Sequence, residues 1–307
     1  MNDSLNTVAV SHTATNGYKV AKKKISLRPG RVEDAQVAGT ICYKAFKTIS
    51  GQHNFPEDFP SPEVAADLLS FLFSHQNVYS VVAELDGQVV GSNFLWKTGS
   101  IAGVGPITVA PAVQNGQIGR QLMEDVLAHA RQQSFAGVRL VQAAYHGRSL
   151  SLYTKLGFVA REPLSVLQGP ALGLEIPGYT VRAATIADVE AGNQLSFNIH
   201  GHTREQELID AVQQGTATVV KRGGRITGYA TLIGFFGYAL GETNDDLKAL
   251  IGAAPAFAGP GFMLPTRNTE LFRWCLEQGL QVVQPLTLMS WGLYNEPAGA
   301  YLPSIIY

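Results

Sequence analysis

The chain contains very little cysteine. Only Cys42 and Cys275 occur among 307 residues, which is too few for a disulfide framework or a cysteine-based zinc site. Each lies in an apolar helical pattern, so we expect both to be small buried residues. The seven histidines show no ligand spacing with carboxylates or cysteines, and we therefore expect no metal.

The chain also lacks an excess of charge and any long apolar run. Its 23 basic and 24 acidic residues give a net charge of −1, which argues against nucleic acid or an acidic membrane as a bulk electrostatic partner. No apolar run reaches the roughly 18 residues that a membrane span needs. Residues 1–23 are polar and have no apolar signal-peptide core, so they predict a flexible arm. We expect a soluble cytoplasmic protein.

A repeated pattern divides the rest of the chain. Arg28 and Asp34, which follow a short apolar run, recur as Arg182 and Asp188, both displaced by 154 residues (182 − 28 and 188 − 34). Two more features are repeated, in the same order in both parts of the chain. The first is a tight turn, in 86–91 and in 223–228, and the second is a helix end with glycine, in 153–158 and in 275–280. The length alone also suggests two domains.

We therefore predict two copies of one fold. The boundaries are an arm over 1–23, a first domain over 24–168, and a second domain with a C-terminal tail over 178–307. Each domain is expected to be α/β (α+β), a mixed and mostly antiparallel sheet flanked by helices. In the first domain we expect strands 24–28, 78–85, 88–97, 101–109, 137–143 and 158–166, and helices 32–48, 62–74, 117–133 and 148–156. In the second we expect strands 178–182, 216–221, 225–232, 234–239, 260–264 and 280–290, and helices 186–198, 203–213, 244–253 and 267–278.

The most informative segment runs from Gly105 to Ala130. An apolar strand ends at Pro111, a loop with Gly116 and Gly119 follows, and a helical pattern then begins. The first N–H groups of a helix have no partner within it and carry partial positive charge, so this arrangement favours an anion such as a pyrophosphate. The spacing matches neither a P-loop nor a dinucleotide fingerprint.

The loop instead resembles that of the GCN5-related N-acetyltransferase (GNAT) superfamily. This family binds acetyl-CoA through Val-x-Pro-x-x-Gln/Arg-x-x-Gly-x-Gly/Ala, and Val109, Pro111, Gln114, Gln117 and Gly119 fall on that spacing. The departure is Gln117, which stands where the family usually has glycine.

A second motif supports the same resemblance. Residues 146–158 look like the family's Asn-x-x-Ala-x-x-Leu-Tyr-x-Lys-Leu-Gly-Phe segment, with His146 in the place of asparagine. In this family such a tyrosine often protonates the departing CoA thiolate, which implies that role for Tyr153. Together the two motifs are strong, although either one alone is weak.

The resemblance implies direct transfer of an acetyl group from acetyl-CoA to an amine. It places the thioester carbonyl at a backbone N–H of Thr108 or Val109 and the pyrophosphate at the loop. The implied cofactor-binding residues are Thr108, Val109, Gln114, Asn115, Gly116, Gln117, Ile118, Gly119, Arg120 and Tyr153. Arg120 is as readily explained as a solvated residue of the first helical turn.

The sequence does not identify the general base. Glu84 precedes a hairpin, His146 begins the second motif, and His53, Glu57 and Asp58 lie in a polar loop that borders the acceptor site in this fold. Tyr153, His146 and Glu84 are the catalytic candidates.

In the second domain, residues 241–246 read Gly-Glu-Thr-Asn-Asp-Asp, whose acidic groups would repel phosphates. We therefore expect that domain to be structural or to shape the substrate site.

The sequence thus predicts an N-acetyltransferase that acts on an amine of a small molecule or peptide. Three alternatives remain: an acyltransferase that uses another acyl-CoA or a hydroxyl acceptor, a CoA-binding sensor without turnover, and a scaffold that binds no CoA. A monomer and a homodimer are both compatible with the sequence.

Overall fold

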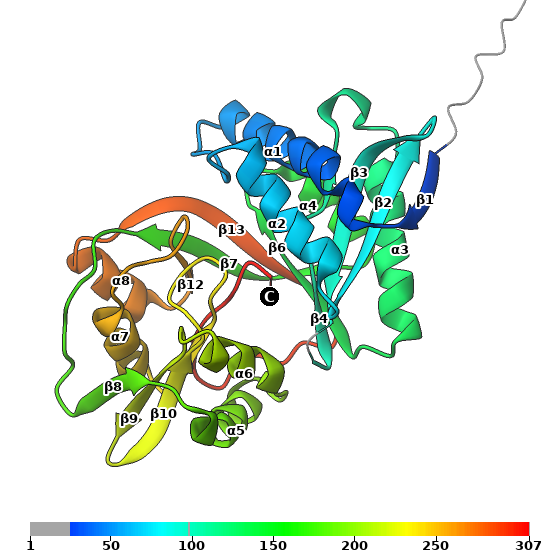
Figure 1. Ribbon diagram of the computed structural model, residues 1–307. Coiled ribbons are helices and arrows are strands. Elements are labelled where there is room, and N and C mark those ends of the chain that lie inside the picture. The colour runs from blue at the N-terminus through cyan, green and yellow to red at the C-terminus, as the bar shows by residue number, and fades with distance from the viewer. Residues whose placement is uncertain (1–24, 98, 307) are drawn as a thin grey trace, which may run out of the picture.

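The computed structural model describes residues 25–97 and 99–306, so the predicted arm over 1–23 lies outside the described residues. Two sheets with helices packed on them form the molecule (Figure 1). We call residues 25–168 the first half and residues 178–306 the second half. Within the described residues, no helix has the length and apolarity needed to cross a membrane.

The first half contains most of the larger sheet. Its strands are β1 (Ile25–Pro29), β2 (Val78–Leu85), β3 (Gln88–Trp96), β4 (Ile101–Val104), β5 (Thr108–Val109), β6 (Gly137–Ala143) and β7 (Val159–Gln168). Its helices are α1 (Ala35–Gln52), α2 (Pro62–Ser74), α3 (Ile118–Gln132) and α4 (Gly147–Lys155), with 3-10 turns at Val32–Asp34 and Pro111–Val113.

The second half begins with a smaller sheet. The strands of the smaller sheet are β8 (Tyr179–Ala183), β9 (Thr218–Arg222), β10 (Arg225–Ala230), β11 (Ala239–Gly241) and β14 (Ala300–Leu302). The second half also contains β12 (Phe262–Pro265) and β13 (Gln281–Gly292), which belong to the larger sheet. Its helices are α5 (Val189–His200), α6 (Glu205–Gln213), α7 (Asn244–Ala253) and α8 (Thr269–Glu277), with a 3-10 turn at Ile186–Asp188.

The predicted fold class is confirmed, because both sheets are mostly antiparallel and are flanked by helices. Two predicted strands were wrong in detail. The strand expected over 101–109 is broken into β4 and β5 at Gly105, which has a φ of 140°. The strand expected over 234–239 is displaced to β11, and the tail supplies β14, which pairs with β11.

The three features that are repeated in the sequence have equivalent local structures in the two halves. Arg28 binds Asp34 through two hydrogen bonds of 2.8 Å, and Arg182 binds Asp188 through two of 2.7 Å. Both turns are hairpins, β2–β3 and β9–β10. The helix ends also match, with Gly157 at a φ of 92° and Gly279 at 86°.

Strands from the two halves nevertheless share one sheet. The order of the larger sheet is β1-β2-β3-β4-β6-β13-β7-β12, so β13 of the second half lies between β6 and β7 of the first. Figure 1 shows β13 and β7 running together between the two halves. Leu164 pairs with Leu286, and each lies the same number of residues after the glycine that ends the preceding helix, Gly157 or Gly279 (164 − 157 and 286 − 279).

The helices cover the first part of this sheet on both faces. One buried cluster joins α3 to the sheet through Leu122, Met123 and Val126. Another joins α1 and α2 to Phe94 through Ala38 and Leu69. Cys42 and Cys275 are both fully buried, as the apolar pattern predicted.

Candidate active site

The larger sheet opens between β5 and β6. Strand β4 pairs in parallel with β6 only from Ile101 to Gly103, and beyond this point β5 pairs with β3. The other edge of β6 pairs with β13 along its whole length, so the second part of β6 has a strand on one side only. The end of β6, the start of α4 and the loop before α3 therefore surround one gap in the sheet. The sequence motifs that resemble the family's cofactor segments meet at this gap.

Strand pairing decides which backbone group faces the opening. Ala110 N–H donates to the carbonyl of Val90 at 2.8 Å, and residues alternate in direction along an antiparallel strand. Thr108 N–H therefore points toward β3, whereas Val109 N–H points away from it. Of the two donors expected from the sequence, the geometry favours Val109.

The loop before α3 ends in a left-handed residue. Gln117 is the N-cap of α3 and has a φ of 64°, and Asn115 has a φ of 70°. A residue other than glycine in this region costs of order 1–2 kcal/mol, so the glycine usual in the family would relieve strain here. The departure at Gln117 thus keeps the backbone shape that glycine would allow.

No side chain caps the N-terminus of α3. The first helical hydrogen bond runs from Gln121 N–H to the Gln117 carbonyl at 3.1 Å, so the N–H groups of Ile118, Gly119 and Arg120 precede it. No acidic residue lies in this first turn. Free N–H groups and the helix dipole together suit an anion.

Gly119 lies between β5 and α4. A Cβ built there would come within 3.7 Å of Val109 Cγ2 and Leu152 Cδ2, which is ordinary contact. Alanine therefore fits at this position, whereas a longer side chain would extend into the mouth of the opening. Less space surrounds Gly116, since a Cβ there would be 3.3 Å from the Val113 carbonyl oxygen.

Arg148 joins the loop, although the sequence motifs did not single it out. Gln114 Nε2 donates to the Val109 carbonyl at 3.1 Å, and Arg148 donates to Gln114 Oε1 at 2.8 Å. Arg148 Nη1 also lies 3.5 Å from Asn115 Oδ1. An exposed guanidinium therefore sits beside the anion loop. Arg120, by contrast, is paired with Glu124 at 2.8 Å.

Helix α4 places three polar side chains in a row. His146 is its N-cap, and its Nδ1 lies 2.5 Å from Ser149 Oγ. Burial raises the pKa of Tyr153 to about 12, although a hydrogen bond from Ser149 acts in the opposite direction. Burial, aided by the nearby Arg148 and His53, lowers the pKa of His146 to about 4. Near neutral pH, Tyr153 is therefore protonated and His146 is uncharged.

Gln142 is a second residue that sequence reasoning missed. It lies on β6, only 6% exposed, and neither atom of its amide has a hydrogen-bond partner among the described residues. Alternation along β6 puts it on the same face as Val138 and Leu140, which pack in one cluster with Tyr153. A buried amide without partners is costly, so this position suits a ligand that offers both a donor and an acceptor.

Glu84 is not brought together with these groups. Its carboxylate accepts from Arg28 Nε at 2.7 Å, next to the Arg28–Asp34 pair. Strands β3 and β4 separate β2 from β6 in the sheet. The ion pair favours a structural role for Glu84 and leaves the base to residues of the acceptor side.

The α1–α2 loop reaches the end of β6. Phe55 stacks on Tyr145 with ring centroids 4.2 Å apart, and His53 lies 5.2 Å from the same ring. Tyr145 donates to Gln284 Oε1 of β13 at 3.1 Å. Asp58 is half-buried beside this group, and burial raises its pKa to about 6.

The corresponding helix of the second half is closed by its own side chains. Thr243 N–H and Oγ1 donate to Asp246 Oδ2 at 2.9 and 2.8 Å, and Thr227 donates to Oδ1 of the same carboxylate. Asp246 is fully buried. A carboxylate of the chain thus holds the place at α7 that an anion would need.

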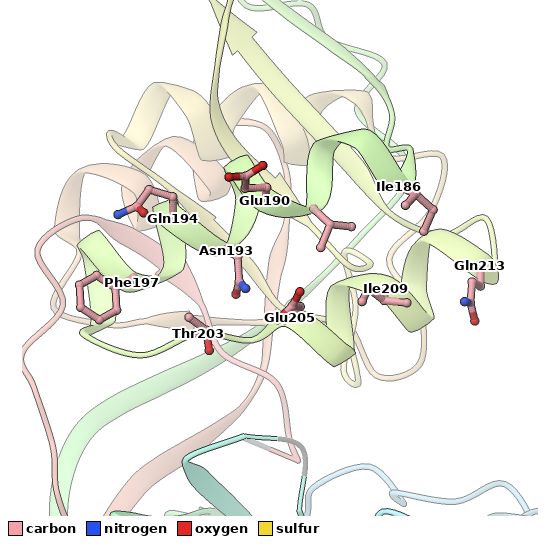
Figure 2. A pocket seen from close by; sticks show the side chains of 10 residues that line it. Ile186, Glu190, Asn193, Gln194, Phe197, Thr203, Glu205, Ile209 and Gln213 are labelled. Carbon is pink, nitrogen blue, oxygen red and sulfur yellow. The ribbon is translucent and has the colours of Figure 1, made fainter.

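The second half has a groove elsewhere. A hollow of about 900 Å³ lies between α5 and α6, and Figure 2 shows Asn193 and Glu205 beside it. Its lining residues are Ile186, Val189, Glu190, Asn193, Gln194, Phe197, Thr203, Glu205, Ile209 and Gln213. None of them belongs to the acetyltransferase-like motifs.

In the part of the chain that the structure describes, no cluster of histidine, cysteine and carboxylate side chains could hold a metal.

Comparison with known proteins agrees with this geometry. A sequence model of the acetyltransferase (GNAT) family matches residues 43–158, which include the loop, α3 and α4. This part of the chain is similar to the acetyltransferase (GNAT) family. The match supports acetyl transfer from an acyl-CoA as the general chemistry. No curated protein matches the chain.

Solved structures show the fold over nearly the whole chain. A proposed acetyltransferase from Pyrococcus horikoshii is 17% identical with a TM-score of 0.67, covering 94% of this chain and 97% of that one. A GCN5-related N-acetyltransferase from Sphaerobacter thermophilus is 16% identical with a TM-score of 0.56, covering 89% and 96%. The fold of both halves is therefore shared with these two chains.

The residues at the opening fit a CoA thioester. The uncapped start of α3 suits its phosphates, and the open space at Gly119 lets them approach the backbone. The orphaned amide of Gln142 suits an amide-bearing arm such as pantetheine.

Proposed function

We propose that the chain is an acetyl-CoA-dependent N-acetyltransferase whose first half binds the donor and carries out direct transfer to an amine. We also propose that the two halves are copies of one domain and that the second has no donor site. The acceptor is an amine of a small molecule or peptide. The residues proposed to hold the donor are Val109, Gln114, Asn115, Gly116, Gln117, Ile118, Gly119 and Arg120, joined by Arg148 and Gln142.

One observation carries the proposal. An uncapped helix N-terminus, a backbone N–H of β5 that points away from its neighbouring strand, and a buried tyrosine all border the same opening. Acyl transfer needs an anchor for the donor's phosphates, a donor for the carbonyl oxygen, and a proton for the leaving sulfur. Each requirement has one matching group here.

The roles follow from these positions. Val109 N–H stabilises the negative charge that develops on the carbonyl oxygen when the amine nitrogen attacks the carbonyl carbon. The carbon–sulfur bond then breaks, and Tyr153 supplies a proton to the sulfur. The nitrogen attacks as a neutral amine, so an acceptor that arrives as an ammonium first gives one proton to solvent or to a base. It loses a second proton in the same way once the amide bond has formed, and this restores the proton that Tyr153 gave to the sulfur. Ser149 and His146 fix the start of α4, so they position Tyr153 rather than react.

The test is amine-dependent release of CoA thiol from acetyl-CoA, with the acetylated product identified by mass. A panel of primary amines is compared with the alcohols of the same shape. The proposal predicts turnover with amines and none with alcohols. Transfer to the alcohols would reassign the enzyme to hydroxyl acceptors, and transfer with propionyl-CoA at an equal rate would reassign the donor.

A CoA-binding sensor is the second candidate, favoured by the strained Gln117 in the donor loop. It predicts tight binding of CoA with no amine-dependent thiol release. The same assay, run beside a binding titration, separates the two.

A further inference from the structure

A polar group of residues lies on the α1–α2 side of the larger sheet. Asp58 comes from the α1–α2 loop, Tyr145 follows β6, and Gln284 belongs to β13 of the second half. Tyr145 donates to Gln284 Oε1 at 3.1 Å, and the side-chain amide of Gln284 stabilises the Asp58 carboxylate. Three segments far apart in the sequence therefore meet at one carboxylate.

The carboxylate of Asp58 has no cation as a partner among the described residues. Its neighbour Glu57 is paired with Lys47 at 2.8 Å, and Lys47 also contacts Tyr43. The groups that Asp58 influences, Tyr145 and the buried Cys42, are neutral near pH 7 because burial raises the pKa of both. A half-buried carboxylate with no counter-charge is unfavourable unless a ligand supplies one.

Flat aromatic side chains border the same carboxylate. Phe55 and Tyr145 stack with an interplanar angle of 11°, and His53 extends the aromatic surface. Both Phe55 and Tyr145 are half-buried. Aromatic faces bind apolar bodies and also attract cations. Carboxylate and rings together match a primary ammonium that is carried on an apolar, flat body.

The group also lies next to the proposed transfer site. Tyr145 immediately precedes His146, the N-cap of α4, and Ala144 N–H donates to the Pro285 carbonyl at 3.1 Å. Strand β13 therefore fixes the connection between β6 and α4. A ligand held at Asp58 would lie beside the helix that carries Tyr153.

We propose that Asp58 binds the ammonium group of the acceptor, that Phe55 and Tyr145 hold its apolar body, and that Gln284 makes the second half part of the acceptor site. This inference rests on the proposed function and names its acceptor class, a primary amine on a flat apolar body. Asp58 touches the acceptor, whereas Gln284 is a positioning residue that acts through Asp58 and Tyr145.

The test measures binding, so it does not depend on turnover. 2-Phenylethylamine, an ammonium at pH 7.5, and the neutral 2-phenylethanol are titrated into the protein saturated with CoA. The amine should bind more tightly than the alcohol. Asp58→Asn should lower the affinity for the amine about 10- to 100-fold, the usual worth of a charged hydrogen bond, and leave the affinity for the alcohol unchanged. Unchanged CoA affinity shows that the variant is folded.

Gln284 has a separate readout. Because protonation of Asp58 removes its charge, the preference for the amine should fall as the pH decreases through about 6. Gln284 stabilises the carboxylate, so Gln284→Met should move this decrease to a higher pH. Loss of a merely structural residue would lower both affinities together and leave the pH of the decrease unchanged. The other groups near Asp58 are His53, Tyr145, Cys42 and the Glu57–Lys47 pair.

Equal affinities of the wild type for amine and alcohol, or an unchanged amine preference in Asp58→Asn, would overturn the inference. Either result leaves the proposed function standing if the thiol-release assay shows amine-dependent turnover. Conversely, a clear amine preference without turnover supports this site and contradicts only the proposed function.

Discussion

The helices α3 and α7 occupy the same place in the order of elements, but their N-termini differ completely. The start of α3 follows a loop that ends in left-handed Gln117, and it has neither a capping side chain nor an acidic residue. Strand β11 passes almost directly into α7, where Thr243 and Asp246 form a capping box and Asp245 adds a second acid. Negative charge near the first N–H groups would stabilise either helix start.

The difference shows how such a site can be lost while the fold is kept. In the second half, the chain supplies the negative charge itself, and the helix gains stability from a buried carboxylate. In the first half, no carboxylate lies in the first turn of α3, and under the proposed function the phosphates of the donor would supply this charge. Helix α4 also starts without a capping side chain or an acid, so the donor site at α3 is proposed from its N-terminus together with the left-handed loop before it and the Val109 N–H that points away from β3.

The comparison of Tyr153 with Cys275 gives the largest expected effect. Both residues lie at the same step before a glycine that ends the helix, and both are buried. Tyr153→Phe removes the proposed acid and should lower kcat about 100-fold or more, while the KM for acetyl-CoA changes little. Cys275→Ala should leave kcat per folded molecule unchanged. Steady-state thiol release measures both, and an undiminished kcat in Tyr153→Phe would remove the assigned role.

Removing the cap of α7 should be the largest effect on stability. Asp246→Ala deprives Thr243 and Thr227 of their acceptor in a fully buried position and should cost about 2–3 kcal/mol of unfolding free energy. Gly119→Ala at the start of α3 has room for its methyl group, and alanine is the better helix former, so this change should be neutral or add up to about 1 kcal/mol. Urea unfolding compares the two, and equal losses would contradict the contrast between the helices.

A single exchange can make α3 resemble α7. Arg120 occupies the third helical position, as Asp246 does in α7, so Arg120→Asp puts a carboxylate where the phosphates are proposed to lie. Affinity for acetyl-CoA should fall about 10-fold, while the helix gains about 0.3–1 kcal/mol from its dipole. Arg120→Gln removes the Glu124 pair without adding negative charge, and it keeps the backbone N–H through which residue 120 is proposed to hold the donor. This variant should therefore bind nearly as well as the wild type. Equal binding by all three proteins would place the phosphates elsewhere.

The smallest expected effect concerns Gln117. Gln117→Gly relieves a left-handed residue but adds freedom to the unfolded chain, so the net gain in stability should not exceed about 1 kcal/mol. Acetyl-CoA affinity should stay the same or rise slightly. Thermal unfolding and titration check this, and a clear loss of affinity would mean that the Gln117 side chain itself contacts the donor.

Local signals in the sequence predicted local structure well. The Asp86–Gly87 turn and the Gly157 helix end both act within a few residues, and the helix over 62–74 was predicted to the residue. The repeated Arg–Asp pair was equally local, because its partners are six residues apart.

Partners distant in the sequence were not predictable. The alternation of β13 is the same whichever strand lies beside it, so nothing in residues 281–292 indicates insertion between β6 and β7. The meeting of Asp58 with Gln284 depends on that insertion, and sequence reasoning could name only the loop. Arg148 and Gln142 were missed for a similar reason, since their significance comes from neighbours across the opening.

Titration of acetyl-CoA into the wild type, Gly119→Glu and Gly119→Ala tests the central claim most directly. The account predicts one donor per chain in the wild type, nearly equal binding in Gly119→Ala, and no measurable binding in Gly119→Glu, where size and charge block the start of α3. Two donors per chain, or undiminished binding by Gly119→Glu, would contradict a single donor site in the first half.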